Sequence, residues 1–184
     1  MFSSFQKKIL KAGHPLLRIP CAPLTKSDLS SPETLNCLSL LKRNLQNDII
    51  GLSAPQVGYS LRILGYRLPS NLLKEYNLAC EIPTTFLINP TYLGIGSTKS
   101  IKYESCSSVP GFNALVSRYE RIQVQSWDAY GSSLDFEASG ILSRIIQHEV
   151  DHLQGVLYTE RMINKSLRHD SYIDEYEFAH LNNS

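Results

Sequence analysis

The chain has 184 residues, of which 42% are hydrophobic and 19% charged, so its length and composition favour one compact domain over residues 1–184. Its 18 basic and 17 acidic residues leave a net charge of +1, which argues against binding nucleic acid or anionic lipid through bulk charge. No apolar stretch approaches the roughly 20 residues that a membrane-spanning helix requires. We therefore expect neither a nucleic-acid partner nor a membrane partner.

The cysteines and the first residues bear on the compartment. Cys21, Cys37, Cys80 and Cys106 are irregularly spaced, and the chain is much larger than a disulfide-stapled miniprotein, so we expect a reducing environment. Residues 1–8 contain Ser, Phe and Lys but no acid, and they are too short for a secretory signal peptide. Two interpretations stay open for them: the stub of an organelle presequence, or a frayed end.

The first predicted element is an amphipathic helix over residues 31–48. Leucines recur there at near-helical spacing, Ser31 can cap the first turn, and Pro32 occupies a position that a helix tolerates. In residues 49–58, which follow, glycines, small residues and a proline favour a tight loop over regular structure.

Four runs rich in β-branched or aromatic residues predict strands: Leu61–Tyr66, Thr84–Asn89, Lys99–Glu104 and Arg121–Trp127. A second helix is expected over residues 139–155, because its apolar residues keep helical spacing and Gly155 suits a C-terminal cap. Strands without regular alternation with helices indicate an α+β fold, with a largely antiparallel sheet packed around the second helix. Residues 164–184 form a polar tail with little pattern.

The second helix carries His148-Glu149-Val150-Asp151-His152, an H-E-x-x-H pattern. Residues four apart share a helix face, so His148 and His152 can bind one metal ion while Glu149 reaches a water molecule beside it. A catalytic site of this kind usually has a third protein ligand. The downstream histidine of the extended zinc-protease pattern is replaced by Tyr158.

Two kinds of third ligand remain open. A carboxylate such as Glu175 would indicate a zinc endopeptidase, but this residue lies in the weakly patterned tail. A thiolate is the other choice. Cys106 follows a strand-like run and precedes the turn signal Pro110-Gly111, where a side chain can point into a site. Cys37, by contrast, has a simple buried interpretation on the first helix.

Three segments resemble the signature motifs of the peptide deformylases, in order and at similar separations. They are Gly-Leu-Ser-Ala-Pro-Gln at 51–56, Glu-Ser-Cys-Ser-Ser at 104–108, and Gln-His-Glu-Val-Asp-His at 147–152. The opening Ile-Leu-Lys-Ala-Gly-His-Pro-Leu-Leu-Arg at 9–18 also resembles that family, and the similarity extends to about Met162. The resemblance implies removal of the N-formyl group from the N-terminal methionine of newly made proteins, with the nascent chain near the ribosome as partner.

The resemblance also implies roles for the metal ligands. Cys106, His148 and His152 hold one divalent ion, which lowers the pKa of a bound water molecule, and Glu149 takes that water's proton and gives it to the departing amine. A thiolate with two imidazoles suits Fe(II) or Zn(II). The family implies Fe(II), replaceable by other divalent ions such as Zn(II), Ni(II) or Co(II).

Other roles concern the substrate. The amide of Gln56 and the backbone N–H of Ser107 are implied as donors to the oxygen on which negative charge grows. The family alignment places these residues at or near the methionine side chain: Gly51, Leu52, Ile141 and Ile145.

The second motif departs from the commonest family form, Glu-Gly-Cys-Leu-Ser, at two positions. In the family, position 107 acts through its backbone N–H, and mitochondrial members also carry a polar residue there. Residues 51–56, residues 139–155 and the polar Ser107 resemble mitochondrial deformylases more than the common bacterial type, so we expect an organelle, with a bacterial cytoplasm as the alternative. Ser105 replaces a glycine that can serve a positive φ or the close approach of substrate. We therefore place Ser105 in the substrate groove, and a catalytically weakened, deformylase-like metal-binding domain stays open as a third interpretation.

Overall fold

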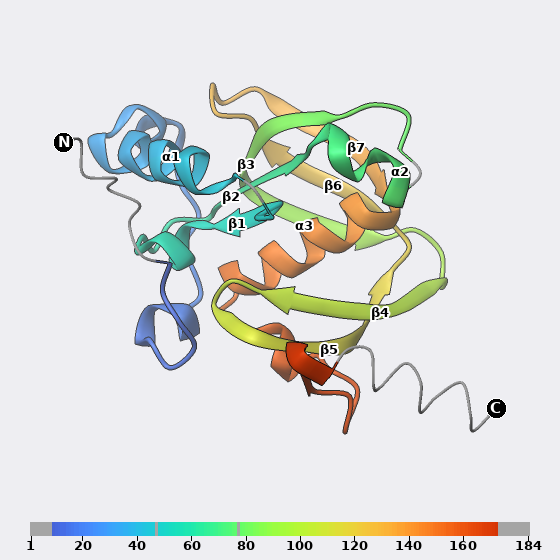
Figure 1. Cartoon of the computed structure of the whole chain (residues 1–184). Helices are drawn as coiled ribbons and strands as arrows, with labels where there is room; N and C mark the ends of the chain where they lie inside the picture. Colours follow the sequence, from blue (N-terminus) through green and yellow to red (C-terminus); the bar gives the residue numbers. More distant parts are fainter. Residues whose placement is uncertain (1–8, 47, 77, 173–184) are drawn as a thin grey trace.

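The computed structural model describes residues 9–46, 48–76 and 78–172 of the chain (Figure 1). Helices and antiparallel strands are mixed along it, so the predicted α+β class is confirmed. The helices are α1 (Pro32–Asn44), α2 (Leu73–Tyr76) and α3 (Gly140–Leu153). The strands are β1 (Gly51–Ser53), β2 (Ile63–Leu68), β3 (Ile82–Gly94), β4 (Lys99–Cys106), β5 (Val109–Tyr119), β6 (Arg121–Trp127), β7 (Ser133–Ser139) and β8 (Arg168–His169).

The strands form two sheets rather than the single sheet that the sequence pattern predicts. One has the order β1-β2-β3-β6-β7 and the other the order β4-β5-β8, and the strand pairs within both are antiparallel. The sheets separate because β3 pairs with β6, so that β4 and β5 form a hairpin of their own. Helix α3 crosses the middle of the molecule and contacts β1, β2, β6 and β7 of the larger sheet and β5 of the smaller one (Figure 1).

Several strands lie where the sequence analysis places none. Strand β1 falls inside the segment predicted as a loop, and it pairs with β2 through Gly51 and Tyr66. Strand β5 contains Pro110 and Gly111, which predict a turn. In the structure they belong to a bulge, where the β4–β5 register shifts and Gly111 takes a φ of +81°. The sequence analysis also does not predict strand β7, although more and less exposed residues alternate along it, with Ala138 facing the core.

The two longer helices are placed by their caps and their buried faces. The hydroxyl of Ser31 accepts the N–H of Thr34 at 3.2 Å at the start of α1, and this helix ends at Asn44, before the predicted boundary. Helix α3 is buried from Ser143 to Leu153, its polar residues included. Buried polar side chains need hydrogen-bond partners. The polar residues of α3 and the groups that contact them are therefore candidates for a functional site.

The N-terminal part of the chain packs against the end of α3. The N–H of Cys21 donates to the carbonyl of Leu153 at 2.9 Å. Gly155, which follows the helix, has a φ of +74°, and a Cβ there would lie 2.6 Å from the carbonyl carbon of Arg18. Glycine is therefore required at this position both by conformation and by space.

Some predictions fall beyond the described residues or concern membranes. Residues 1–8, most of the polar tail and Glu175 lie outside them. Within the described ranges, no helix is long and apolar enough to cross a membrane. The four cysteines all lie in the described ranges and form no disulfide bond there, and Cys80 is the exposed one.

Candidate active site

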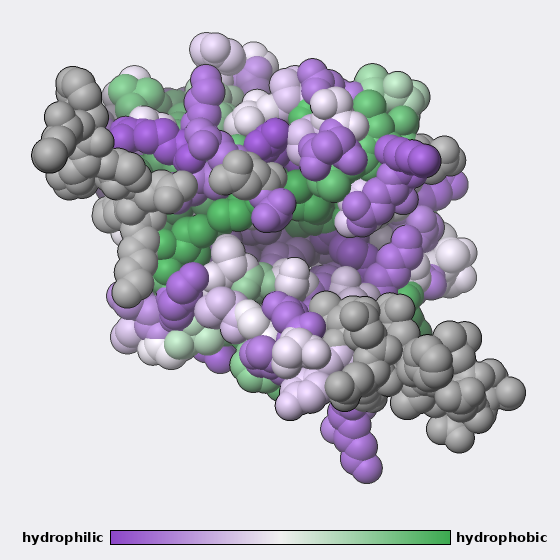
Figure 2. Space-filling view, viewed as in Figure 1, coloured by the Kyte–Doolittle hydropathy of each residue, from purple (hydrophilic) through white to green (hydrophobic). Residues whose placement is uncertain are grey.

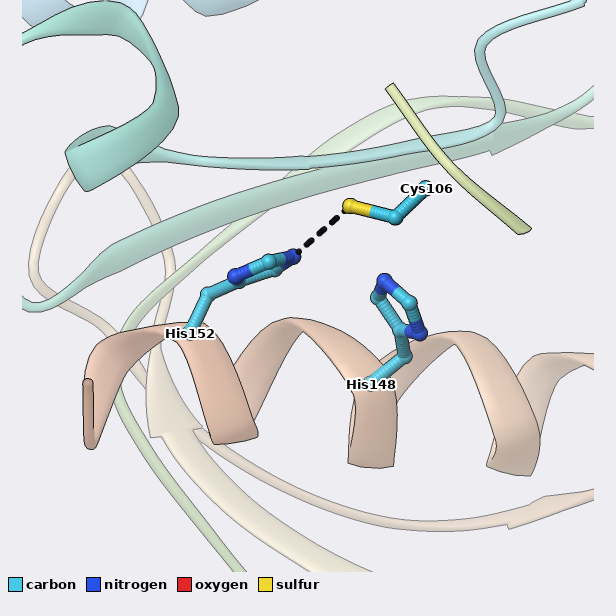
Figure 3. A group of neighbouring side chains, drawn as sticks. All are labelled: Cys106, His148 and His152. Carbon is cyan, nitrogen blue, oxygen red and sulfur yellow. Dashed lines mark hydrogen bonds between the residues drawn. The ribbon is translucent and has the colours of Figure 1, made fainter. Parts of the chain in front are cut away.

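Three segments, distant in sequence, meet beside α3. Helix α3 contributes His148, Glu149 and His152, the β4–β5 hairpin contributes Cys106, and the turn after β1 contributes Gln56. Figure 3 shows the sulfur of Cys106 facing the two imidazole rings, which project from successive turns of α3. The spacing of four residues between the histidines places both rings on the side of the helix that faces the hairpin.

One potential ligand atom from each of Cys106, His148 and His152 lies within 4.8 Å of the others. The Sγ of Cys106 and the Nε2 of His152 are 3.3 Å apart, and all three side chains are almost entirely excluded from solvent. A thiolate and two imidazoles are a donor set that suits divalent transition metals. The converging donors and their burial therefore fit a metal ion.

Local turns hold the hairpin and the Gln56 side chain in place. Ser107 and Ser108 form the turn between β4 and β5, and the N–H of Ser108 donates to the Sγ of Cys106 at 3.4 Å. The Oε1 of Gln56 accepts the N–H and the hydroxyl of Ser53, each at 2.8 Å. This leaves the Nε2 of Gln56 pointing at the hairpin, 3.6 Å from the Cys106 sulfur and 3.2 Å from the Ser108 hydroxyl.

The orientation of His148 is fixed by a buried carboxylate. Its Nδ1 lies 2.9 Å from Glu104 and its ring stacks on Tyr158, so Nε2 is the nitrogen that remains for a ligand. Burial alone would lower the pKa of His148, but interactions with Cys106 and Glu104 raise it well above its usual value. For His152, burial and then the neighbouring His148 lower the pKa well below the usual value.

A buried charge network surrounds Glu104 that the sequence analysis does not identify. Arg118 contacts both carboxylate oxygens at 3.0 Å, and Arg144 donates to one of them at 2.7 Å. Arg118 also pairs with Asp151 at 2.5 Å. Burial alone would raise the pKa of Glu104, but hydrogen bonds from His148 and Arg118 hold it well below its usual value. The sequence does contain one indication of this network. Arg144 lies one helical turn before His148 on the same face of α3, where it can reach the same carboxylate.

Glu149 follows His148 on α3 and faces β1, where its side chain is almost entirely buried. Its Oε2 is buried without a hydrogen-bond partner among the described residues. A Cβ at Gly51 would lie 2.6 Å from the Oε1 of Glu149 and 2.9 Å from a methyl carbon of Ile145, so only glycine allows this approach. Burial is the main cause that raises the pKa of Glu149 to about 7. A carboxyl group with that pKa can take and release protons near neutral pH.

A cleft of about 490 Å³ opens over these groups. It forms a hollow across the face shown in Figure 2, with hydrophobic surface along one border. Four of the residues predicted to contact substrate line it: Gly51, Ser105, Ile141 and Ile145. The side chain of Leu52 is instead fully buried in the core formed with α1.

Ser105 fits its strand without strain. It is exposed, it pairs with Asn113 on β5, and it is not among the residues with positive φ. Of the two reasons for a glycine at this position, a positive φ does not apply to this chain, and the close approach of substrate stays a prediction. The cleft also has aromatic and aliphatic lining residues that the sequence analysis does not identify: Ile49, Ile50, Tyr76, Tyr103, Val109 and Phe112.

Comparisons with known proteins place this geometry in a family. The family model described as polypeptide deformylase matches residues 6–168. Peptide deformylase 1 of Nitrosomonas europaea is 35% identical over 173 residues, which cover 91% of this chain and 93% of that protein. The mitochondrial peptide deformylase of Homo sapiens is 32% identical over 169 residues, covering 86% of this chain and 68% of that protein.

A solved structure agrees in fold. The class I type b peptide deformylase from Acinetobacter baumannii, with Met-Ala-Ser bound, matches with a TM-score of 0.74 and 29% identity, covering 84% of this chain and 96% of that one. The family model spans most of the sequence, and the α+β fold agrees with it. The chain therefore belongs to the polypeptide deformylase family of enzymes.

Proposed function

We propose that this enzyme removes the formyl group from the N-terminal formyl-methionine of newly made proteins, using a divalent metal ion held by Cys106, His148 and His152. One observation carries the proposal. A thiolate and two imidazoles converge beside the carboxylate of Glu149, one oxygen of which has no hydrogen-bond partner among the described residues, at the base of a cleft of about 490 Å³. This combination supplies metal ligands and a proton acceptor within one buried site.

The donor set limits the choice of metal. A bound divalent ion acts as a Lewis acid that lowers the pKa of water and polarises a carbonyl oxygen. Thiolate and imidazole ligands suit Fe(II) and Zn(II), and we propose Fe(II), with Zn(II), Ni(II) and Co(II) as replacements.

The chain's own groups then move protons and stabilise charge. Glu149 takes a proton from the attacking water molecule as the water oxygen bonds to the formyl carbon, and returns a proton to the amine when the C–N bond breaks. The products are formate and a peptide with a free N-terminal amine. The amide of Gln56 and the N–H of Ser107 donate to the formyl oxygen as negative charge grows on it.

The cleft fits an extended peptide that begins with an apolar side chain. Ile141 and Ile145 supply an apolar wall beside Gly51. Strand β1 lies at one edge of its sheet and β4 at one edge of the other, and Gly51 and Ser105 bring both edges to the cleft. An extended peptide can hydrogen-bond to such strand edges through its backbone. The Acinetobacter baumannii relative binds Met-Ala-Ser, which has this character.

The direct test is release of formate. Protein loaded anaerobically with Fe(II), or with Ni(II), is incubated with formyl-Met-Ala-Ser, with acetyl-Met-Ala-Ser as the matched control. We expect formate from the first peptide and no product from the second. Full metal occupancy without formate would favour the weakened, metal-binding domain, whereas cleavage of internal peptide bonds would favour the zinc endopeptidase.

Removing the Cys106 thiol distinguishes a site with a cysteine ligand from a site with a carboxylate ligand. Cys106→Ser should lose bound metal as measured by elemental analysis, while Cys37→Ser, at a buried site on α1, should keep it. Retention of metal in the Cys106 variant would point to a carboxylate ligand. Metal analysis of protein purified without oxygen, together with loss of activity in air that Ni(II) or Co(II) prevents, tests the choice of Fe(II).

We also infer an organellar location. The support is the polar Ser107 of the second motif and the 32% identity to a human mitochondrial deformylase; the bacterial relative from Nitrosomonas europaea is 35% identical. Locating the tagged protein in the cells that make it tests this. A cytoplasmic signal would contradict it.

A further inference from the structure

Residues 9–12, an irregular segment near the start of the described chain, bind to both loops that carry the proposed oxyanion donors. The N–H of Leu10 donates to the carbonyl of Gln56 at 2.9 Å, and the N–H of Ala12 donates to the carbonyl of Ser108 at 2.8 Å. Between them, the ammonium group of Lys11 donates to the carbonyl of Ser107 at 2.7 Å. Three successive residues therefore join the turn after β1 to the β4–β5 hairpin.

This connection matters because the direct hydrogen bonds between the two loops, within the described residues, all come from a single side-chain nitrogen. Within the described residues, those bonds run from the Nε2 of Gln56 to Cys106, Ser107 and Ser108, at 3.6, 3.4 and 3.2 Å. In the proposed reaction the same Nε2 must turn towards the formyl oxygen. The bonds from residues 10–12 use other atoms, so they can hold the loops together while Gln56 engages the substrate.

We propose that residues 9–12 act as a clasp that sets the separation of the two oxyanion donors, and that Lys11 is a positioning residue acting through Ser107. This inference rests on the proposed function. The carbonyl that Lys11 holds belongs to the residue whose N–H is one of the donors, so fixing it restricts rotation of that residue. A hydrogen bond from a cationic donor is stronger than one between neutral groups, which suits it to this task.

An effect on catalysis distinguishes a positioning role from a merely structural one. An exposed lysine contributes little to the stability of a fold, so its loss should leave the melting temperature and metal content unchanged. Donors to a developing oxyanion act mainly in the transition state. Misplacing them should therefore lower kcat and leave KM nearly constant.

The first experiment compares three variants loaded with Ni(II), using formyl-Met-Ala-Ser as substrate. Lys11→Met removes the donor but keeps the length of the stem, Lys11→Arg keeps a cationic donor, and Lys42→Met removes the same charge from the exposed face of α1. We expect Lys11→Met to lower kcat about threefold to tenfold with KM within about twofold. Lys11→Arg should recover most of the activity, and Lys42→Met should match the parent.

Several outcomes would overturn the clasp. They are an unchanged kcat in Lys11→Met, an equal loss in Lys42→Met, or a loss that follows a fall in metal content or melting temperature.

A second measurement does not depend on activity. Amide hydrogen exchange should become faster at residues 54–57 and 106–109 in Lys11→Met and stay unchanged along α3. If the parent releases no formate but amide exchange is still faster in Lys11→Met, the proposed function is wrong, whereas the role of residues 9–12 in holding the two loops is supported. If the parent is active and neither kcat nor exchange responds, the clasp is wrong and the proposed function stands.

Discussion

The two walls of the cleft differ in how their polar groups are paired. On the β4–β5 side, Glu104 is bound by Arg118, Arg144 and His148, and each of these contacts is 3.0 Å or shorter. On the β1 side, Glu149 faces glycine and isoleucine with one oxygen unpartnered. Both carboxylates are buried, but their pKa values are shifted in opposite directions.

This difference separates two tasks that buried carboxylates perform. Glu104 stays ionised because its charge is neutralised by fixed cations, and it orients His148, a proposed metal ligand. Glu149 keeps a pKa near neutrality because burial disfavours its charged form, and no salt bridge among the described residues offsets this; that is the property a proton shuttle needs. The same residue type therefore has a positioning role on one side of α3 and a proposed catalytic role on the other.

The largest expected effect on activity is at Glu149, on the β1 side of the cleft. Glu149→Gln keeps the shape of the side chain but cannot accept a proton, so deformylation should fall by about 10²–10⁴-fold while the metal content is unchanged. Steady-state kinetics and elemental analysis measure the two quantities. Glu137→Gln, on the exposed strand β7, is the control and should behave as the parent. Turnover of Glu149→Gln within a few-fold of the parent would exclude Glu149 as the base.

On the β4–β5 side, we expect removal of a buried cation to lower the stability of the fold. Arg118→Met leaves Glu104 and Asp151 as buried carboxylates without their main partner, so the free energy of unfolding should fall by about 3–5 kcal/mol. Urea denaturation measures this. Arg121→Met breaks an exposed pair with Glu137 and is the matched control, for which no measurable change is expected. Equal stability of the two variants would show that the buried network is not structural.

Gly51→Ala tests the close contact between β1 and Glu149. The added Cβ would lie 2.6 Å from the Oε1 of Glu149, so the carboxylate must move. Displacement of a catalytic group by about 1 Å can cost up to about 10²-fold, and we expect kcat/KM to fall by about tenfold or more with metal still bound. Parental kinetics would mean that Glu149 does not need its present position.

The smallest effect is expected at Ser105, on the rim of the paired wall. Ser105→Gly removes a Cβ from the groove without relieving strain, because Ser105 has no positive φ. If that Cβ restricts the substrate backbone, kcat/KM on formyl-Met-Ala-Ser should rise by a few-fold to about tenfold with unchanged metal content. A slower glycine variant would indicate that the serine hydroxyl contacts the bound peptide.

Prediction from sequence worked best where spacing along one element decides the geometry. His148 and His152 lie four residues apart on one helix, so their common face, with Glu149 one step along the helix, could be predicted from helical periodicity. The partners of Glu104 could not be found in this way, because Arg118 and Arg144 reach it from β5 and α3 and their pairing depends on tertiary packing. Pro110 and Gly111 misled the strand prediction, since a bulge uses the same residues as a turn.

The contact of Gly155 with the backbone of Arg18 bears on the order in which the protein assembles during synthesis. The ribosome makes the N-terminal segment first, yet Arg18 needs Gly155, and Lys11 needs Ser107, which lies 96 residues further along. Such long-range contacts close only after the intervening chain is made and folded. The first described residues to be synthesised are therefore among the last to be fixed. A chain that stops before Gly155 would contain the partners of residues 10–12 but not the contact that Arg18 makes at the end of α3.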